Sequence, residues 1–434
     1  MEKFVIVGRG PLQGEVAISG AKNAALPIMA ATLLTTDECV IENVPLVQDV
    51  RTMAELLRQL GCWVELDEVE HRVTVRAPDR LQLNTEVPLE LARKMRASFL
   101  VTGAILARAG QVRAPHPGGC SIGRRPVNVD IKSFAAMGAQ VLQDTDEYLL
   151  RADRLRGERI YLDYPSHTGT ENVLLAATLA EGSTTLKHAS AEPEVSDLIF
   201  CLQQMGARIT GAGTSYLTVE GADELHGVHY RVMPDRLEAG TYAIAGAISG
   251  GDVVVLDAVS DHMDPLTHKL REVGLTVDVE PGHYHVRATR GLCPVELQTL
   301  HFPGFPTDLQ SSFATLLTQA DGISLIHERV FDDRLQYAGE LRKLGAQIEV
   351  SGHTATIHGP SRLTGTTVKA LDIRCGAALI LAAVAAEGTT EIQDIYHVDR
   401  GYERVEAKLR GLGVSIERVP QEIAQSVAVA QPVG

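Results

Sequence analysis

Ala136-Met137-Gly138-Ala139-Gln140-Val141 predicts the end of a helix, a turn on a glycine and the start of a strand. A glycine suits this exit because the backbone just beyond a helix commonly takes a left-handed conformation. Similar strings recur at Gln59–Val64, Gln204–Ile209, Glu272–Val277, Lys343–Ile348 and Gly411–Ile416. Their glycines fall at 61, 138, 206, 274, 345 and 413, with spacings of 77, 68, 68, 71 and 68 residues. The chain is therefore predicted to be a sixfold repeat.

A second phrase recurs out of phase with the first: an alanine-rich helix, a small turn and a strand rich in threonine. Its clearest copies are Leu175–Leu186 and Leu381–Ile392, and looser copies lie near 30–36, 102–111, 243–252 and 314–322. Each unit of about seventy residues thus holds two helices and several short strands, and units of this length share cores to bury their apolar faces. The pattern predicts an α/β fold made of these α+β repeats.

The length of 434 residues exceeds what one hydrophobic core usually supports, so we expect two domains with three units each. The join is expected near residues 227–236, after the third unit. The first domain is predicted to be 21–230. Residues 1–20 predict strands without a unit of their own, which complete a second domain with 231–419. The small, polar tail 420–434 is expected to be disordered.

The composition describes a globular protein with a strong negative charge. Apolar residues make up 45% and charged residues 22% of the chain, and the formal net charge is −15 at pH 7. This charge argues against nucleic acid or acidic lipid as a partner, and so against a nucleic-acid clamp built from repeated modules. An anionic substrate must instead be met by a local cluster of cations.

The cysteines and the apolar runs indicate a cytoplasmic protein. Six cysteines are scattered without a CxxC pair, and His283 with His285 has no third ligand in view, so no metal is expected. Residues 1–8 contain no signal-peptide core, and the ten-residue apolar run Ala377–Ala386 is too short to span a bilayer. Five of the six cysteines are expected to be buried structural thiols.

The sixth cysteine lies in the glycine-rich string Pro117-Gly118-Gly119-Cys120-Ser121-Ile122-Gly123-Arg124-Arg125-Pro126. Two neighbouring guanidinium groups favour a thiolate over a thiol, so Cys120 is predicted to have a lowered pKa. The same arginines can bind phosphate or carboxylate through forked hydrogen bonds. The string therefore predicts a reactive thiol beside an anion site.

Two further residues point to chemistry but also have plainer explanations. Lys22 is predicted near the start of an alanine-rich helix, where it would reinforce an anion site, although a single lysine is usually a solvated surface group. Asp308 follows Pro306 and Thr307, a pattern that also predicts a helix start with Thr307 or Asp308 as its cap.

Several rare strings resemble those of the enolpyruvyl transferases, in the same order and over residues 1 to about 419. They are Ser19–Pro27, Lys94–Ser98, Pro117–Pro126, Pro165–Asn172, Phe305–Gln310, Phe331–Arg334, Leu371–Arg374 and His397–Arg404. The resemblance implies a two-domain inside-out α/β barrel of six βαβαββ units, three per domain, whose domains face each other across a cleft. The strings are most similar to those of the members that act on UDP-N-acetylglucosamine.

The resemblance also implies the site residues. Cys120 would be the thiol of a mobile loop and act as the acid or in product release. Asp308 would be the base for the acceptor hydroxyl and Asp372 a proton-transfer group; with Lys22 and Arg400 they are the expected catalytic residues. The expected substrate ligands are Lys22, Asn23, Arg96, Arg125, Pro126, Val127, Asn128, Val129, Asp130, Ser166, Thr168, Asp308, Arg334, Arg374 and Arg400. Seven cations are expected to converge in the cleft: Lys22, Arg96, Arg124, Arg125, Arg334, Arg374 and Arg400.

The implied reaction moves the enolpyruvyl group of phosphoenolpyruvate to the 3′-hydroxyl of UDP-N-acetylglucosamine and releases phosphate. It would be the first committed step of peptidoglycan synthesis, and so serve cell wall biogenesis, cell shape, the cell cycle and cell division. No cofactor is expected, since the arginines supply the positive charge. The protein is expected to be a monomer or weak homo-oligomer and a target of fosfomycin.

The sequence departs from the family pattern at six positions, Arg124, Asn128, Asp130, His167, Thr168 and Asp333. Four of them, Asn128, Asp130, His167 and Thr168, fall where the sugar nucleotide is bound in the family. An acceptor such as a free nucleotide or shikimate 3-phosphate therefore remains an alternative. A second alternative is a non-catalytic paralogue that binds sugar nucleotide and regulates a partner.

Overall fold

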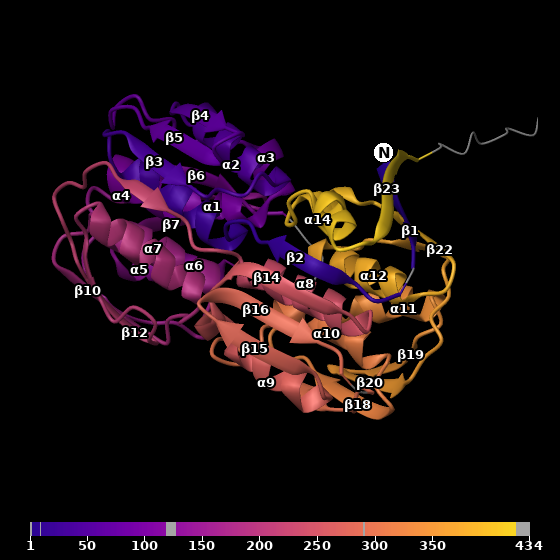
Figure 1. The fold of residues 1–434 in the computed structure, drawn as a ribbon. Helices are drawn as coiled ribbons and strands as arrows, with labels where there is room; N and C mark the ends of the chain where they lie inside the picture. The colour runs from indigo at the N-terminus through magenta and orange to yellow at the C-terminus, as the bar shows by residue number, and fades with distance from the viewer. Residues whose placement is uncertain (1, 9, 119–126, 290, 422–434) are drawn as a thin grey trace, which may run out of the picture.

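The computed structural model describes residues 2–8, 10–118, 127–289 and 291–421. Within these residues the strands form six sheets, three in each half of the molecule (Figure 1). No described helix is both long enough and apolar enough to cross a membrane.

The first half contains three sheets, with strand orders β13-β3-β5-β4, β6-β8-β7 and β11-β12-β10-β9. Their strands are β3 (Cys39–Glu42), β4 (Trp63–Asp67), β5 (Arg72–Arg76), β6 (Gln111–Pro115), β7 (Gln140–Gln143), β8 (Glu147–Arg151), β9 (Arg159–Tyr161), β10 (Ser183–Lys187), β11 (Arg208–Thr210), β12 (Tyr216–Glu220) and β13 (His229–Arg231). The helices are α1 (Lys22–Ala31), η1 (Thr32–Leu34), α2 (Gln48–Gln59), α3 (Leu89–Lys94), η2 (Arg96–Leu100), α4 (Val101–Ala109), α5 (Asn128–Ala136), α6 (His167–Ala177) and α7 (Pro193–Gln204).

The second half repeats this plan, with strand orders β15-β16-β14-β2, β17-β18-β20-β19 and β21-β22-β1-β23. Its strands are β1 (Glu2–Val7), β2 (Gln13–Ala17), β14 (Asp252–Ala258), β15 (Thr276–Glu280), β16 (Gly282–Arg287), β17 (Glu296–Gln298), β18 (Gly322–His327), β19 (Gln347–Ser351), β20 (Thr354–Gly359), β21 (Thr367–Lys369), β22 (Thr389–Gln393) and β23 (Ser415–Pro420). The helices are α8 (Arg236–Ile248), η3 (Ser260–Met263), α9 (Asp264–Val273), α10 (Thr307–Leu317), η4 (Arg334–Gln336), α11 (Tyr337–Lys343), α12 (Ile373–Ala385), α13 (Tyr396–Asp399) and α14 (Val405–Gly411).

The unit β9-α6-β10-α7-β11-β12 shows the repeat most simply. Its first two strands, joined through α6, are parallel, and the remaining pairs are antiparallel. The six predicted glycines at 61, 138, 206, 274, 345 and 413 all have φ between +94° and +106°. That left-handed conformation carries almost no penalty for glycine, so the predicted helix exits are confirmed.

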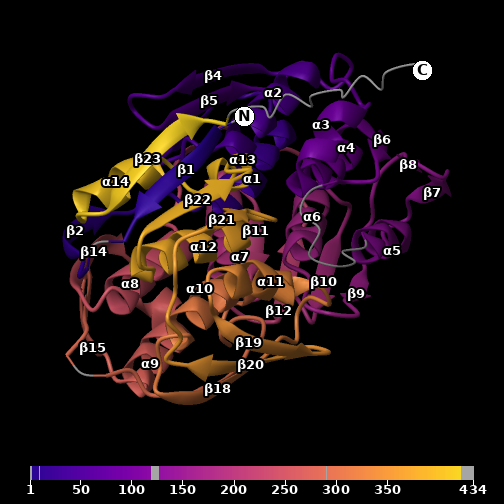
Figure 2. The same cartoon turned by 90° about the vertical axis from the view of Figure 1, so that its right-hand side faces the viewer.

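The central helices lie inside and the sheets outside. All thirteen residues of α8 are buried, and α8, α10 and α12 pack against one another within the second half (Figure 2). Beyond Glu238 the helix is almost entirely apolar, and a helix that is apolar on every side needs such complete enclosure. The architecture is the expected two-domain inside-out α/β barrel, with three units in each domain.

The start of the chain completes the second half. Strand β1 lies between β22 and β23 and pairs antiparallel with both, and β2 pairs parallel with β14 (Figure 1). Buried apolar side chains form two clusters, one within residues 21–233 and one within 4–18 plus 237–416. These clusters support our proposal that the domains are 21–230 and 1–20 plus 231–419.

Phe4→Ala tests whether the first strand is part of the second core. Phe4 is fully buried, so we expect the free energy of unfolding to fall by about 3–5 kcal/mol, as for other truncated core aromatics. Phe200→Ala is the control, because Phe200 is 48% exposed and should lose far less. Urea denaturation followed by far-UV circular dichroism would measure both, and equal losses would contradict the assignment.

Candidate active site

A cavity of about 450 Å³ lies between the two halves and is lined by both. Its described lining includes four carboxylates, Asp49, Glu192, Asp308 and Asp372. It also includes seven cations, Lys22, Arg96, Arg236, Arg329, Arg334, Arg374 and Arg400. The lining is thus net cationic on a chain whose formal charge is −15, which suits an anionic substrate.

A larger cavity of about 520 Å³ has the opposite character. It is lined by three carboxylates, Asp257, Asp261 and Glu280, against one cation, Arg231. Such a surface repels anions, so the smaller cavity is the candidate active site.

Several helix N-termini lie at the candidate site. Lys22 is the first residue of α1, His167 of α6 and Arg236 of α8, while Asp308 and Arg374 are the second residues of α10 and α12. Unpaired amide groups make each N-terminus partly positive. The parallel packing of the central helices therefore directs several such ends at one cavity.

Asp49 connects cations from the two halves. It lies in the first turn of α2 and accepts hydrogen bonds from Lys22 Nζ at 3.4 Å and Arg400 Nε at 2.9 Å. Lys22 belongs to the first half and Arg400 follows α13 in the second. The structure thus brings Lys22 and Arg400 together, as the sequence predicted.

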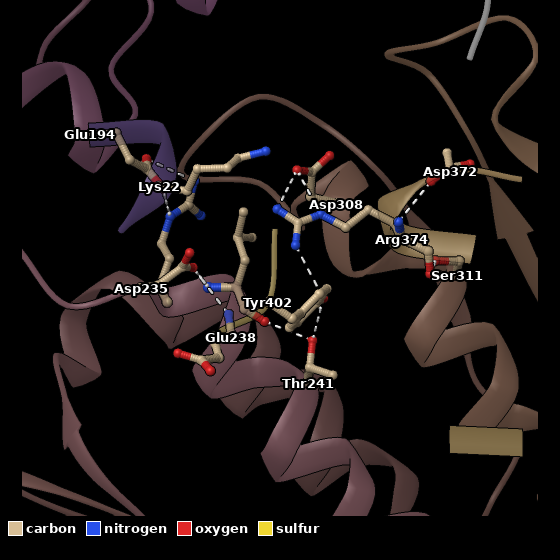
Figure 3. Close-up of polar contacts among 12 residues, drawn as sticks. Lys22, Glu194, Asp235, Glu238, Thr241, Asp308, Ser311, Asp372, Arg374 and Tyr402 are labelled. Atoms are coloured by element: carbon tan, nitrogen blue, oxygen red, sulfur yellow. Dashed lines mark hydrogen bonds and ion pairs between the residues drawn. The ribbon is translucent and has the colours of Figure 1, made fainter. Parts of the chain in front are cut away.

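Asp308 is held between two arginines. Its Oδ2 accepts hydrogen bonds from Arg374 Nε at 3.0 Å and Nη2 at 2.9 Å (Figure 3). Its Oδ1 accepts one from Arg334 Nη2 at 2.9 Å. Burial alone would raise the pKa of Asp308, but the charges of Arg374 and Arg334 outweigh burial and hold this pKa far below its usual range. Asp308 is therefore ionised in the cavity without substrates.

The prediction that Thr307 or Asp308 caps α10 is wrong, whereas Asp372 caps a different helix, α12. The residue before α10 is Pro306, and no side chain caps the helix there. The hydroxyl of Thr307 donates to Glu328 Oε2 at 2.8 Å instead. Asp372 caps α12 instead, because its Oδ1 accepts from the backbone amides of Arg374 at 2.7 Å and Cys375 at 3.1 Å (Figure 3). Asp372 also lines the cavity, so a structural role and contact with a substrate are compatible.

The start of α6 forms the opposite wall. Ser166 is the N-cap and its Oγ accepts from Gly169 N at 3.1 Å, while Thr168 lines the cavity. His167 Nε2 lies 3.1 Å from Glu171 Oε1. Burial lowers the pKa of His167, but the charge of Glu171 outweighs it and raises the pKa to about 9. His167 thus adds a cation where the family pattern has an apolar residue.

Arg236 is a buried cation that sequence reasoning missed. Its Nε donates to Glu194 Oε1 at 3.0 Å and its Nη2 contacts Glu192, although the two glutamates lie at the start of α7 in the first half. A charge buried this deeply needs such partners. The sequence signal was present, since Asp235 caps α8 directly before Arg236 at the predicted join. Asp49 and Arg329, also missed, lie in no string that we had singled out.

The residues predicted to bind the nucleotide are divided by the structure. Asn23 and Arg96 line the cavity. Val127, Val129 and Asp130 are buried behind it and Asn128 is exposed, so none of these four lines the part described. Asp130 accepts from Asn172 Nδ2 at 2.8 Å, and burial raises the pKa of Asp130 to about 6. Cys120, Arg124, Arg125 and Pro126 lie outside the described residues.

The other five cysteines differ from one another. Cys39, Cys62, Cys201 and Cys375 are buried, and burial raises the pKa of each thiol. Cys293 is exposed, so the expectation of five buried thiols is wrong for this residue. It lies in the connection between β16 and β17, outside both strands.

Comparisons with known proteins identify the family of the chain. Residues 6–409 match the family described as EPSP synthase (3-phosphoshikimate 1-carboxyvinyltransferase). UDP-N-acetylglucosamine 1-carboxyvinyltransferase 2 of Carboxydothermus hydrogenoformans is 47% identical over 421 residues, which cover 96% of this chain and 100% of the relative. UDP-N-acetylglucosamine 1-carboxyvinyltransferase 1 of Caldanaerobacter subterraneus is 45% identical over 416 residues, covering 96% and 99%.

Solved structures show the same fold. The enolpyruvyl transferase NikO from Streptomyces tendae superimposes with a TM-score of 0.87 at 27% identity, over 96% of this chain and 99% of that one. EPSP synthase from Acinetobacter baumannii has a TM-score of 0.74 at 18% identity, over 97% and 100%, and so supports the fold alone. The chain belongs to the EPSP synthase family of enolpyruvyl transferases, and within it to the UDP-N-acetylglucosamine 1-carboxyvinyltransferases.

Proposed function

We propose that this protein transfers the enolpyruvyl group of phosphoenolpyruvate to the 3′-hydroxyl of UDP-N-acetylglucosamine, with release of phosphate. The observation that carries the proposal is an ionised carboxylate, Asp308, at the centre of a cavity lined by cations from both halves. Both substrates are anions, and relatives at 44–47% identity carry the name of this activity.

In the proposed reaction, the hydroxyl oxygen bonds to C2 of phosphoenolpyruvate while its proton passes to Asp308. Cys120 donates a proton to C3, which gives a tetrahedral intermediate. A C3 proton then leaves through Asp372, the bond between C2 and the phosphate oxygen breaks, and inorganic phosphate departs. Lys22, Arg125 and Arg400 would neutralise the charge that develops on the phosphate and carboxylate.

The hydrogen bonds from Arg374 and Arg334 affect the proposed role of Asp308 as a base. Arg374 and Arg334 keep the carboxylate ionised, but they also weaken its attraction for a proton. An anionic substrate bound by Arg374 would draw that arginine away from Asp308 and so strengthen the base. The proposed order is therefore that phosphoenolpyruvate binds before the hydroxyl is deprotonated.

The remaining parts of the proposal concern the protein in the cell. We assign it to peptidoglycan synthesis in the cytoplasm, and hence to cell wall biogenesis, cell shape and cell division, as a monomer or weak homo-oligomer. Asn23, Arg96, Ser166 and Thr168 are proposed ligands of the sugar nucleotide, since all four line the same cavity. A free nucleotide as acceptor is the second candidate, because Asn128, Asp130, His167 and Thr168 depart from the family pattern.

Phosphate release tests donor and acceptor together. The protein should release phosphate from phosphoenolpyruvate when UDP-N-acetylglucosamine is present, and not when uridine monophosphate or shikimate 3-phosphate replaces it. Mass spectrometry should find a product heavier than UDP-N-acetylglucosamine by one enolpyruvyl group. Release with another acceptor of the panel, and not with the sugar nucleotide, would reject the assigned acceptor.

Asp308→Asn should lower kcat by about 10³-fold, because the amide keeps the shape of the side chain but cannot accept the proton. Its thermal stability should also fall, since Arg374 and Arg334 lose their shared anion. Asp321→Asn, at an exposed position beyond the far end of α10, serves as the control. A kcat within tenfold of the parent would remove Asp308 from the mechanism.

Cys120→Ser should abolish covalent modification by fosfomycin, because the hydroxyl is a much weaker nucleophile than the thiolate. Intact-protein mass spectrometry should show one adduct on the parent and none on this variant. Cys293→Ser is the matched control, as Cys293 is an exposed thiol, and its adduct should persist. The opposite pattern would place the reactive thiol at 293.

A further inference from the structure

Arg374 is held from behind by two buried hydroxyl groups. Its Nη1 lies 3.1 Å from Tyr402 Oη, and Tyr402 Oη lies 2.9 Å from Thr241 Oγ1 (Figure 3). Thr241 Oγ1 in turn donates to the carbonyl oxygen of Leu237, one turn back in α8, at 2.8 Å. Tyr402, Thr241 and Arg374 are all buried, so these bonds are shielded from water.

The hydrogen bonds of this series can run in only one direction. Thr241 has a single hydroxyl proton, and the carbonyl of Leu237 can only accept it. Thr241 must therefore accept the proton of Tyr402, which leaves the lone pairs of Tyr402 Oη for Arg374. A guanidinium has no acceptor, so Arg374 donates to Tyr402. The carbonyl of Leu237 thereby fixes the direction of the hydrogen bonds of Thr241, Tyr402 and Arg374.

The other edge of the same guanidinium donates to Asp308 through Nε and Nη2. The Tyr402 ring also lies beneath the guanidinium, with its centroid 5.4 Å from Arg374 Cζ. Arg374 is only 4% exposed and is thus fixed on one edge by Asp308, on the other by the Tyr402 hydroxyl and on its face by the ring. Removal of the hydroxyl would leave one buried N–H of Arg374 without this acceptor.

We propose that Tyr402 is a positioning residue of the reaction: its hydroxyl, oriented by Thr241, holds Arg374 at the angle from which the arginine serves both Asp308 and the anionic donor. This inference rests on the proposed function and extends it to a residue outside the cavity lining. Tyr402 touches neither the substrate nor the reacting atoms in this scheme and acts through Arg374 alone.

Charged groups from several elements face this pair. Asp308 is flanked by Arg374 of α12, Arg334 of η4 and Lys22 of α1, and Asp235 before α8 also acts on Arg374. Because Arg374 is the largest of the attractive charges on Asp308, a looser Arg374 raises the pKa of that carboxyl. A base is lost as pH falls through its pKa, so the acid limb of activity would move to higher pH.

The second half contains a matched pair of hydroxyls that is suited to a control. Thr267 donates to Met263 O at 3.0 Å, one turn back, and its Oγ1 lies 2.7 Å from Tyr284 Oη. Both residues are buried, and among the described residues no arginine is hydrogen-bonded to Tyr284. Tyr284→Phe therefore removes the same kind of bond without reaching the candidate site.

The kinetic test compares Tyr402→Phe with Tyr284→Phe. Tyr402→Phe should lower kcat/KM for phosphoenolpyruvate by roughly 10- to 100-fold, as expected for the loss of a hydrogen bond to a charged group. The KM for UDP-N-acetylglucosamine should stay unchanged, and the acid limb of kcat, which reports the complex with the substrates, should move to higher pH. Tyr284→Phe should reduce the melting temperature to a similar extent and change neither kinetic property.

A second measurement is independent of activity. In ¹⁵N-labelled protein without substrates, the Arg374 Nε–H signal, assigned with Arg374→Lys, should exchange with solvent at least several-fold faster in Tyr402→Phe and at the parental rate in Tyr284→Phe. If the parent does not release phosphate from the two substrates, the proposed function fails, and this exchange rate still decides whether Tyr402 positions Arg374. If Tyr402→Phe does not fold, Thr241→Val with Thr267→Val as its control carries the same comparison.

If the Arg374 Nε–H of Tyr402→Phe exchanges with solvent at the parental rate, Tyr402 does not position Arg374. If Tyr402→Phe has the same pH profile and the same kcat/KM as Tyr284→Phe, Tyr402 is not important for the reaction. Faster exchange together with a raised KM for phosphoenolpyruvate alone supports the proposal.

Discussion

Cations buried at helix N-termini need carboxylates beside them, and this requirement shapes the whole centre of the molecule. A helix start is already partly positive, so a neighbouring arginine such as Arg374 is strongly unfavourable on its own. Asp308 offsets that charge through three hydrogen bonds from two arginines. The depressed pKa of Asp308 and the raised pKa of Arg374 are two views of the same attraction.

The same requirement joins the two halves. Carboxylates of the first half bind cations of the second: Asp49 binds Arg400, and Glu192 and Glu194 bind Arg236. The backbone amide of Leu46 likewise donates to Glu403 Oε2 at 3.0 Å across the junction. Buried ion pairs add little net stability, but breaking one is costly because a charge is left uncompensated. Such contacts therefore specify how the halves meet rather than how strongly each half folds.

The parts of the fold that follow from local chemistry were predictable. A glycine that ends a helix in the left-handed region serves the same purpose in every repeat, so all six exits were found from the recurring strings around it. The cations of the cavity were harder to predict from the sequence, because pairs such as Arg236 with Glu194 join residues from different halves. Asp308 and Asp372 show the same limit: each follows a turn at a helix start, yet only Asp372 caps its helix. What separates them is their position: Asp372 is the residue before α12, whereas Asp308 is the second residue of α10 and is bound by Arg334 and Arg374.

Asp49 in the first half and Asp308 in the second each neutralise cations that line the cavity. Asp49 lies between Lys22 and Arg400, and Asp308 between Arg374 and Arg334, so each carboxylate takes a place beside cations that a phosphate or carboxylate of a substrate could also take. Binding of an anion is then an exchange of partners rather than the creation of new charge. The exchange releases a carboxylate next to the bound substrate, and a released carboxylate is a stronger base than a clamped one. In the proposed reaction, a cavity that is neutralised from within would thus couple the arrival of an anionic substrate to the basicity needed for the next step.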